Sequence, residues 1–96
     1  MIKVKKSKNL ILISGHAGMA DYGKDIVCAS VSSIVYTTIN AIAKINDRAI
    51  EVKDDESMEI KVISNDEITS SLISNMMDLL KDLESDYPKN INVKEC

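Results

Sequence analysis

The chain has 96 residues, of which 45% are hydrophobic and 28% charged, a balance that argues against disorder and predicts one domain over residues 1–96. The net charge is −3 and no long basic stripe is present, so we expect no direct nucleic-acid partner. Two cysteines, Cys28 and Cys96, are too few for a disulfide-rich secreted domain. Since we find neither a signal peptide nor a segment of membrane-spanning length, we expect a cytoplasmic protein with no membrane partner.

The N-terminal residues predict a β-hairpin. Isoleucine and valine alternate with lysine over residues 2–5, which is typical of a strand with one buried face. Residues 6–9 are polar and indicate a turn, and residues 10–14 predict the second strand. All three glycines of the chain lie in the following segment, residues 15–24, which we predict to be a flexible loop.

The middle of the chain predicts a buried helix and two more strands. Asp25 precedes a long stretch that is apolar on more than one face, so we predict a largely buried helix that ends near Asn46. Its β-branched residues have low helix propensity, which burial must outweigh. Residues 48–53 and 58–63 alternate in polarity and predict two strands, joined by the polar turn 54–57.

A second helix is expected from Ser64 onwards. Ser64 and Glu67 fit a capping box, with Ser64 as the N-cap. We expect one apolar face, made of Ile68, Leu72, Ile73, Met76, Leu79, Leu80 and Leu83. Because Met76 and Met77 are adjacent, we expect that they cannot both face one core, and we place a candidate dimer surface on the exposed side of this helix.

The end of the chain completes the predicted fold. Pro88 and Asn90 stop the second helix, and Ile91 and Val93 predict a last strand. The resulting order, ββαββαβ, predicts an α+β fold in which two helices pack on a mixed, mostly antiparallel sheet.

Cys28 and His16 are the residues most suited to chemistry. If Asp25 is the N-cap, Cys28 lies at the third helical position, where unbonded N–H groups and the positive helix end favour a thiolate or an oxyanion. A helix end contributes ~0.3–1 kcal/mol, which lowers the pKa of a thiol by less than about one unit. Cys28 therefore needs a cationic neighbour, and His16 is the only histidine.

Taken alone, these residues leave other interpretations open. A cysteine early in an apolar helix is more often a core residue than a nucleophile, and a lone histidine is more often a surface residue. The glycine-rich loop lacks the phosphate-binding motifs, and a structural zinc site needs about four ligands. A redox sensor that pairs Cys28 with Cys96 also remains open.

The run GHAGMADYGKDIVCASVS, residues 15–32, resembles the signature of the ribosomal-processing cysteine protease family, Prp. In that family a Gly-His-Ala element and a loop precede Gly-x-Asp-x-Val-Cys-Ala-x-Val-Ser, which opens a helix. The resemblance implies a cysteine endopeptidase with Cys28 as nucleophile and His16 as general base. It implies that Asp25 caps the helix or orients His16, and that Ser32 either lines the site or donates a hydrogen bond back into its own helix. Further supporting or substrate-binding positions are Gly15, Ala17, Gly18, Tyr22 and Gly23.

The resemblance also implies a substrate and an assembly. The enzyme would remove the N-terminal extension of large-subunit ribosomal protein twenty-seven during ribosome assembly, through a Cys–His dyad. It would act as a homodimer and need no cofactor or metal. The alternative is a non-enzymatic, ribosome-associated module that binds the same peptide without cutting it.

Overall fold

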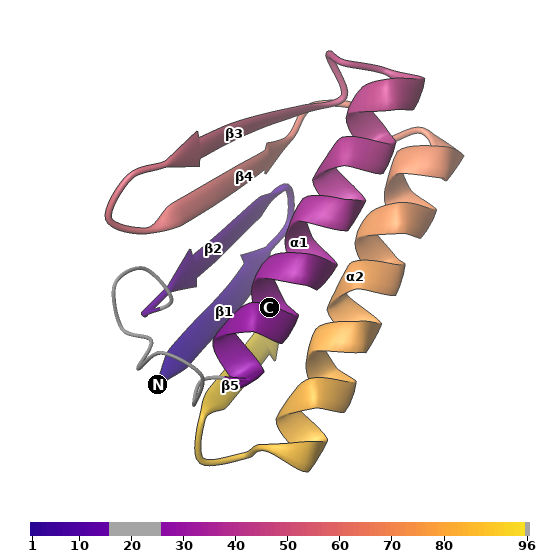
Figure 1. Ribbon diagram of the computed structural model, residues 1–96. Helices are drawn as coiled ribbons and strands as arrows, with labels where there is room; N and C mark the ends of the chain where they lie inside the picture. The colour runs from indigo at the N-terminus through magenta and orange to yellow at the C-terminus, as the bar shows by residue number, and fades with distance from the viewer. Residues whose placement is uncertain (16–25, 96) are drawn as a thin grey trace.

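The computed structural model describes residues 1–15 and 26–95 (Figure 1). The elements run β1 (Ile2–Ser7), β2 (Leu10–Ser14), α1 (Ile26–Ile45), β3 (Ile50–Asp54), β4 (Met58–Val62), α2 (Glu67–Asp86) and β5 (Ile91–Glu95). The predicted order and α+β class are confirmed, as are the first hairpin and the end of the first helix. The third strand differs from the prediction, because it starts two residues later and includes Asp54, which we expected in the turn.

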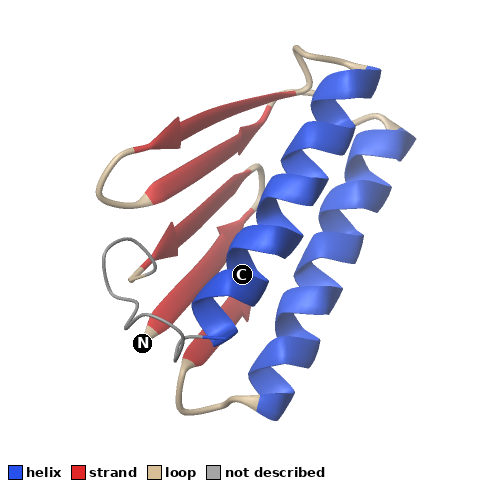
Figure 2. Cartoon of the chain, in the orientation of Figure 1, coloured by secondary structure: helices blue, strands red, loops and turns tan. Residues whose placement is uncertain are grey.

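The described strands form one mixed sheet in the order β3-β4-β2-β1-β5. Neighbouring strands are antiparallel, except that β1 and β5 are parallel, as the crossover through α2 requires. Both helices lie side by side on one face of this sheet, and no element within residues 1–15 and 26–95 covers the opposite face (Figure 2). The predicted mixed, mostly antiparallel sheet is therefore confirmed.

The core lies between the sheet and the two helices. Alternate residues of β1 point into it, so that Ile2 and Val4 are buried while Lys3 and Lys5 are exposed. In β2 and β4 the same alternation buries Ile11, Ile13, Met58, Ile60 and Val62. The chain has no Phe or Trp, so aliphatic and methionine side chains fill this space. The helices cover one face of the sheet, so each strand alternates between apolar and polar residues. This alternation is why the strands could be predicted from the sequence.

The expectation that no segment reaches membrane-spanning length is wrong for α1. This 20-residue helix is long and apolar enough to cross a bilayer by length and composition alone. A core helix passes the same test, and α1 packs against α2 and β3. Its buried residues are Val27, Cys28, Val31, Val35, Thr38 and Ile42. This buried face accounts for only part of the apolar content, because Ile26 and Ile45 are exposed, and the prediction of a largely buried helix is therefore wrong.

The predicted capping box of the second helix is also wrong. The N-cap is Asp66, whose carboxylate accepts a hydrogen bond from the Thr69 N–H at 2.7 Å. The Ser64 N–H donates to the Ala49 carbonyl, at 3.0 Å, beside the end of β4, and so does not donate to the Glu67 side chain as a capping box requires. The Ser64 hydroxyl instead donates to the Asp66 carboxylate. Both residues therefore serve one cap, two positions later than expected.

Asp66→Asn tests this cap through the pH dependence of stability. The hydrogen bonds from the Ser64 hydroxyl and the Thr69 N–H lower the pKa of Asp66 below its usual value. Because the pKa of Asp66 is lower in the folded than in the unfolded protein, the ionised carboxylate stabilises the fold at pH values above the unfolded pKa. This stability is lost as the pH falls through the folded pKa. Wild type should therefore exceed Asp66→Asn in thermal midpoint near about pH 6 and lose that advantage towards about pH 3.

Thermal unfolding followed by circular dichroism across this pH range provides the measurement. Glu67→Gln is the matched control, because it removes an equal charge one residue away from the capping hydrogen bonds. An advantage over Asp66→Asn that stays constant with pH would contradict the assigned cap.

The expected apolar face of α2 needs correction as well. Met76 and Met77 are 0% and 1% exposed, whereas Ile68 and Leu79 are 53% and 41% exposed. The helix packs against α1 on one side and β5 on the other, so its buried arc is wide enough for two adjacent residues. The argument from the methionines for a dimer surface on α2 is therefore wrong.

Candidate active site

Cys28 lies in the first turn of α1. The helix begins at Ile26, so Cys28 is its third residue, as the spacing from Asp25 predicted. Its side chain is 9% exposed and borders the core beside Val27 and Val31. The N–H groups of a first turn have no acceptor within the helix, and they carry the positive end of the helix dipole. A sulfur here has oxyanion-stabilising donors nearby.

Gly15 follows the last residue of β2 and precedes His16 in the sequence. Its φ is +83°, a left-handed conformation that favours glycine. A Cβ at this position would collide with the Met1 carbonyl oxygen and lie 3.2 Å from the carbonyl carbon. The end of β2 therefore passes so close to the N-terminus that only glycine fits without a shift of backbone.

Gly15→Ala is expected to lower the free energy of unfolding by more than about 1 kcal/mol, because both the positive φ and the contact with Met1 oppose a side chain. Urea denaturation measures this loss. Removing Met1 from the Gly15→Ala variant, so that the colliding carbonyl is absent, should restore part of the lost free energy of unfolding. Equal stability of Gly15→Ala and wild type would contradict the observed path of β2.

Ser32 lies one helical turn after Cys28 and is half-buried. It lines a recess between α1 and the β2–β4 pair, together with Ile13, Val31, Val35, Tyr36 and Met58. Ser32 and Cys28 thus lie on the same face of α1. Ser32 could line the site only from this face.

The remaining predicted site residues lie outside the described residues. They are His16, Ala17, Gly18, Tyr22, Gly23 and Asp25. The structure therefore places Gly15, Cys28 and Ser32, at the end of β2 and in the first two turns of α1. Within the described ranges, no group of His, Cys, Asp and Glu side chains could hold a metal ion.

Sequence reasoning missed Tyr36 and Asp54. The Tyr36 hydroxyl donates a hydrogen bond to the Asp54 carboxylate and so joins α1 to the end of β3. This hydrogen bond, together with partial burial and the negative charge of Asp54, raises the pKa of Tyr36. The spacing of four residues from Ser32 to Tyr36 is a signal that could have placed the tyrosine on the Cys28 face. Its pairing with a distant aspartate had no local signal.

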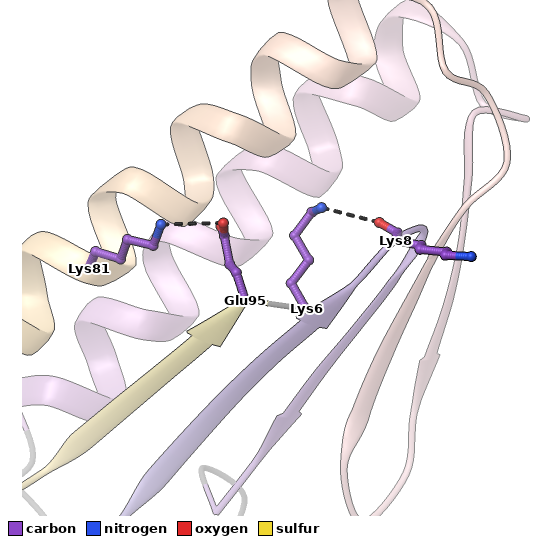
Figure 3. A network of polar contacts seen from close by, with 4 residues as sticks. All are labelled: Lys6, Lys8, Lys81 and Glu95. Carbon is purple, nitrogen blue, oxygen red and sulfur yellow. Dashed lines mark hydrogen bonds and ion pairs between the residues drawn. The ribbon is translucent and has the colours of Figure 1, made fainter.

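A second hollow lies near the other end of β1 and β2 and carries no comparable chemistry. It is an open groove bordered by Lys6, Lys8 and Glu95, with α2 on the opposite side. Figure 3 shows the Lys6 ammonium donating to the Lys8 carbonyl, at 3.1 Å, and an ion pair between Lys81 and Glu95, at 3.4 Å. Exposed ion pairs of this kind contribute about 0–1 kcal/mol to stability. We assign these contacts a structural role at the end of the sheet.

Comparisons with known proteins identify the family of the chain. A family model described as cysteine protease Prp matches residues 1–92. The chain is 32% identical to the ribosomal processing cysteine protease Prp of Mycoplasma genitalium, covering 99% of this chain and 96% of that protein. It is 27% identical to the protein of the same name from Bacillus subtilis, covering 84% and 80% of the two chains.

Solved structures show the same fold. The ribosomal processing protease Prp from S. aureus, in complex with a substrate peptide, superposes with a TM-score of 0.89 at 24% identity and full coverage of both chains. The protein SMU.848 from Streptococcus mutans gives a TM-score of 0.82 at 28% identity, covering 98% of this chain and 90% of that one. The arrangement of two helices on a five-stranded mixed sheet is thus shared with a peptide-bound protease.

Proposed function

The chain belongs to the cysteine protease Prp family and is a cysteine endopeptidase, and we propose that it removes the N-terminal extension of large-subunit ribosomal protein twenty-seven during ribosome assembly. The observation that carries this proposal is Cys28 in the first turn of α1, within a family match that spans residues 1–92. Relatives named for ribosomal processing support the substrate class.

We propose that Cys28 and His16 act as a dyad. The Cys28 sulfur attacks the carbonyl carbon of the scissile bond, and the N–H groups of the first turn of α1 stabilise the oxyanion. His16 holds the thiol proton as an imidazolium and gives it to the leaving amine as the C–N bond breaks. Water, deprotonated by His16, then attacks the thioester, and the C–S bond breaks. Asp25 caps α1 or orients His16, and neither step needs a cofactor.

The segment around the dyad would recognise the peptide. We propose that Ala17, Gly18, Tyr22 and Gly23 contact the substrate backbone and side chains, since they separate His16 from Cys28 in the sequence. We further propose that the enzyme works in the cytoplasm, where its ribosomal substrate is made, and that it forms a homodimer.

Incubation of the purified full chain with the extended ribosomal protein, followed by intact mass measurement, tests the proposed function. We expect one cut near the N-terminus of the substrate. A substrate that stays uncut but co-purifies with the protein would overturn the assignment in favour of the peptide-binding module. Cleavage of unrelated proteins at comparable rates would overturn the proposed substrate.

A further inference from the structure

The sheet face opposite the helices differs in charge between its two halves. On the β3–β4 half, each lysine lies directly opposite a glutamate in the antiparallel ladder, because Lys53 pairs with Glu59 and Lys61 pairs with Glu51. Directly opposite residues point to the same face and lie about 5 Å apart, so each of these lysines has a compensating charge. The strands β3 and β4 therefore contribute no net charge to this face.

The β1–β5 half of the same face carries three lysines without such partners. Lys5 is paired with Lys94 across the parallel β1–β5 ladder, and Lys3 is paired with Asn92. All three lysines are exposed, and within the described part of the chain none of them forms an ion pair. Like charges on paired residues repel each other, so an anion bound between the lysines would relieve this repulsion.

The three lysines border an open hollow on this face of the sheet. Its other lining residues are Val4, Leu12, Ser14 and Asn92, none of which is acidic. The chain as a whole has a net charge of −3, so the hollow is opposite in sign to the molecule that carries it. Edge strands often carry lysine to prevent pairing with other chains, but β1 lies inside the sheet, between β2 and β5. Edge protection therefore does not account for the lysines of β1.

The lining of the hollow distinguishes between classes of anionic partner. Protein interfaces are depleted in lysine and depend on aromatic and apolar anchors, whereas Leu12 is the one apolar lining residue here that is not buried. Among the described residues, no aromatic side chain lines the hollow, so it offers no platform on which single-stranded bases could stack. Lysines without either feature suit the phosphate backbone of a double-stranded nucleic acid.

We propose that the hollow bordered by Lys3, Lys5 and Lys94 binds the phosphate backbone of double-stranded RNA. The choice of RNA rests on the proposed function, since a protease that processes a ribosomal protein works where ribosomal RNA is present. The expectation of no nucleic-acid partner was based on the order of residues in the sequence. Lys94 is distant from the other two lysines in that order and joins them only through the parallel pairing of β1 and β5.

Fluorescence anisotropy of a labelled RNA duplex, titrated with the purified full chain at several salt concentrations, tests the proposal. Three phosphate contacts predict a slope of about −2.7 for the logarithm of the binding constant against the logarithm of the salt concentration. This slope is a loss of affinity of about 40-fold between about 50 and 200 mM salt. Each lysine that is replaced should reduce the slope by about 1. The triple variant Lys3→Gln, Lys5→Gln and Lys94→Gln should therefore bind RNA at least about tenfold more weakly at about 50 mM salt, with almost no dependence on salt.

The matched control is the triple variant Lys44→Gln, Arg48→Gln and Lys81→Gln. It removes the same charge from α1, from the connection between α1 and β3, and from α2, all outside the hollow. The control should keep the salt slope of wild type, because the phosphate contacts are retained. Circular dichroism verifies that both variants are folded.

Three results would overturn the RNA surface: no binding by wild type at about 50 mM salt, an equal loss of binding in the control, or tighter binding of polyglutamate than of RNA. Cys28→Ala should bind RNA as wild type does, because the hollow does not include this residue. The proposed function is measured separately, by cleavage of the extended ribosomal protein. Cleavage without RNA binding would overturn only the RNA surface, and RNA binding without cleavage would overturn only the proposed substrate.

Discussion

Replacing Cys28 with alanine is expected to lower the rate of substrate cleavage by about 10⁴-fold or more, because it removes the sulfur that forms the thioester. The change removes one sulfur from a side chain that is only 9% exposed, so the helix and sheet should stay folded. Single-turnover cleavage of the extended ribosomal protein, followed by intact mass, measures the loss. Circular dichroism on the same samples verifies the fold.

The control for this experiment is Ser30→Ala. Ser30 lies two residues further along α1 and on another face of the helix, so its removal should leave the cleavage rate within about twofold of wild type. His16→Ala should lose as much activity as Cys28→Ala, and the double variant should lose no more, since the two residues act as one unit. A Cys28→Ala protein that cleaves within tenfold of the wild-type rate would contradict the dyad.

The sequence predicts those parts of the fold in which the pattern of apolar and polar residues matches the pattern of buried and exposed side chains. Alternation in residues 2–5 predicts β1 because one face of the sheet is covered by helices and the other faces solvent. The position of Cys28 in the first helical turn follows from the polar residue Asp25 before an apolar run, and α1 does begin at Ile26. Such features depend on neighbours in the chain and can be predicted from them.

Features that depend on distant contacts could not be predicted. Ser64 and Asp66 are both good caps, and the choice was decided by the hydrogen bond from the Ser64 N–H to Ala49, fifteen residues earlier in the chain. The recess between α1 and the β2–β4 pair likewise depends on the register that brings Ile13 opposite Met58. Local propensity contains no information on either pairing.

Met76→Ala and Met77→Ala are each expected to lower the free energy of unfolding by about 2–5 kcal/mol, although the two residues are adjacent. Both side chains are almost fully buried, at 0% and 1% exposed, so each truncation leaves a cavity in the core. Adjacent helical residues point about 100° apart, which the wide arc between α1 and the sheet accommodates. Urea denaturation of both variants and wild type measures the two losses.

Leu79→Ala is the matched control on the same helix. Leu79 is 41% exposed, so its truncation should cost less than about 1 kcal/mol, near the range of surface substitutions. If Met77→Ala cost as little as Leu79→Ala, the second methionine would face solvent, and α2 would again be a reasonable place for a dimer surface. If both variants lose a large and equal amount of unfolding free energy, both methionines are buried and neither can contact a partner. The dimer surface should then be sought on the sheet face opposite the helices or on the exposed side of α1.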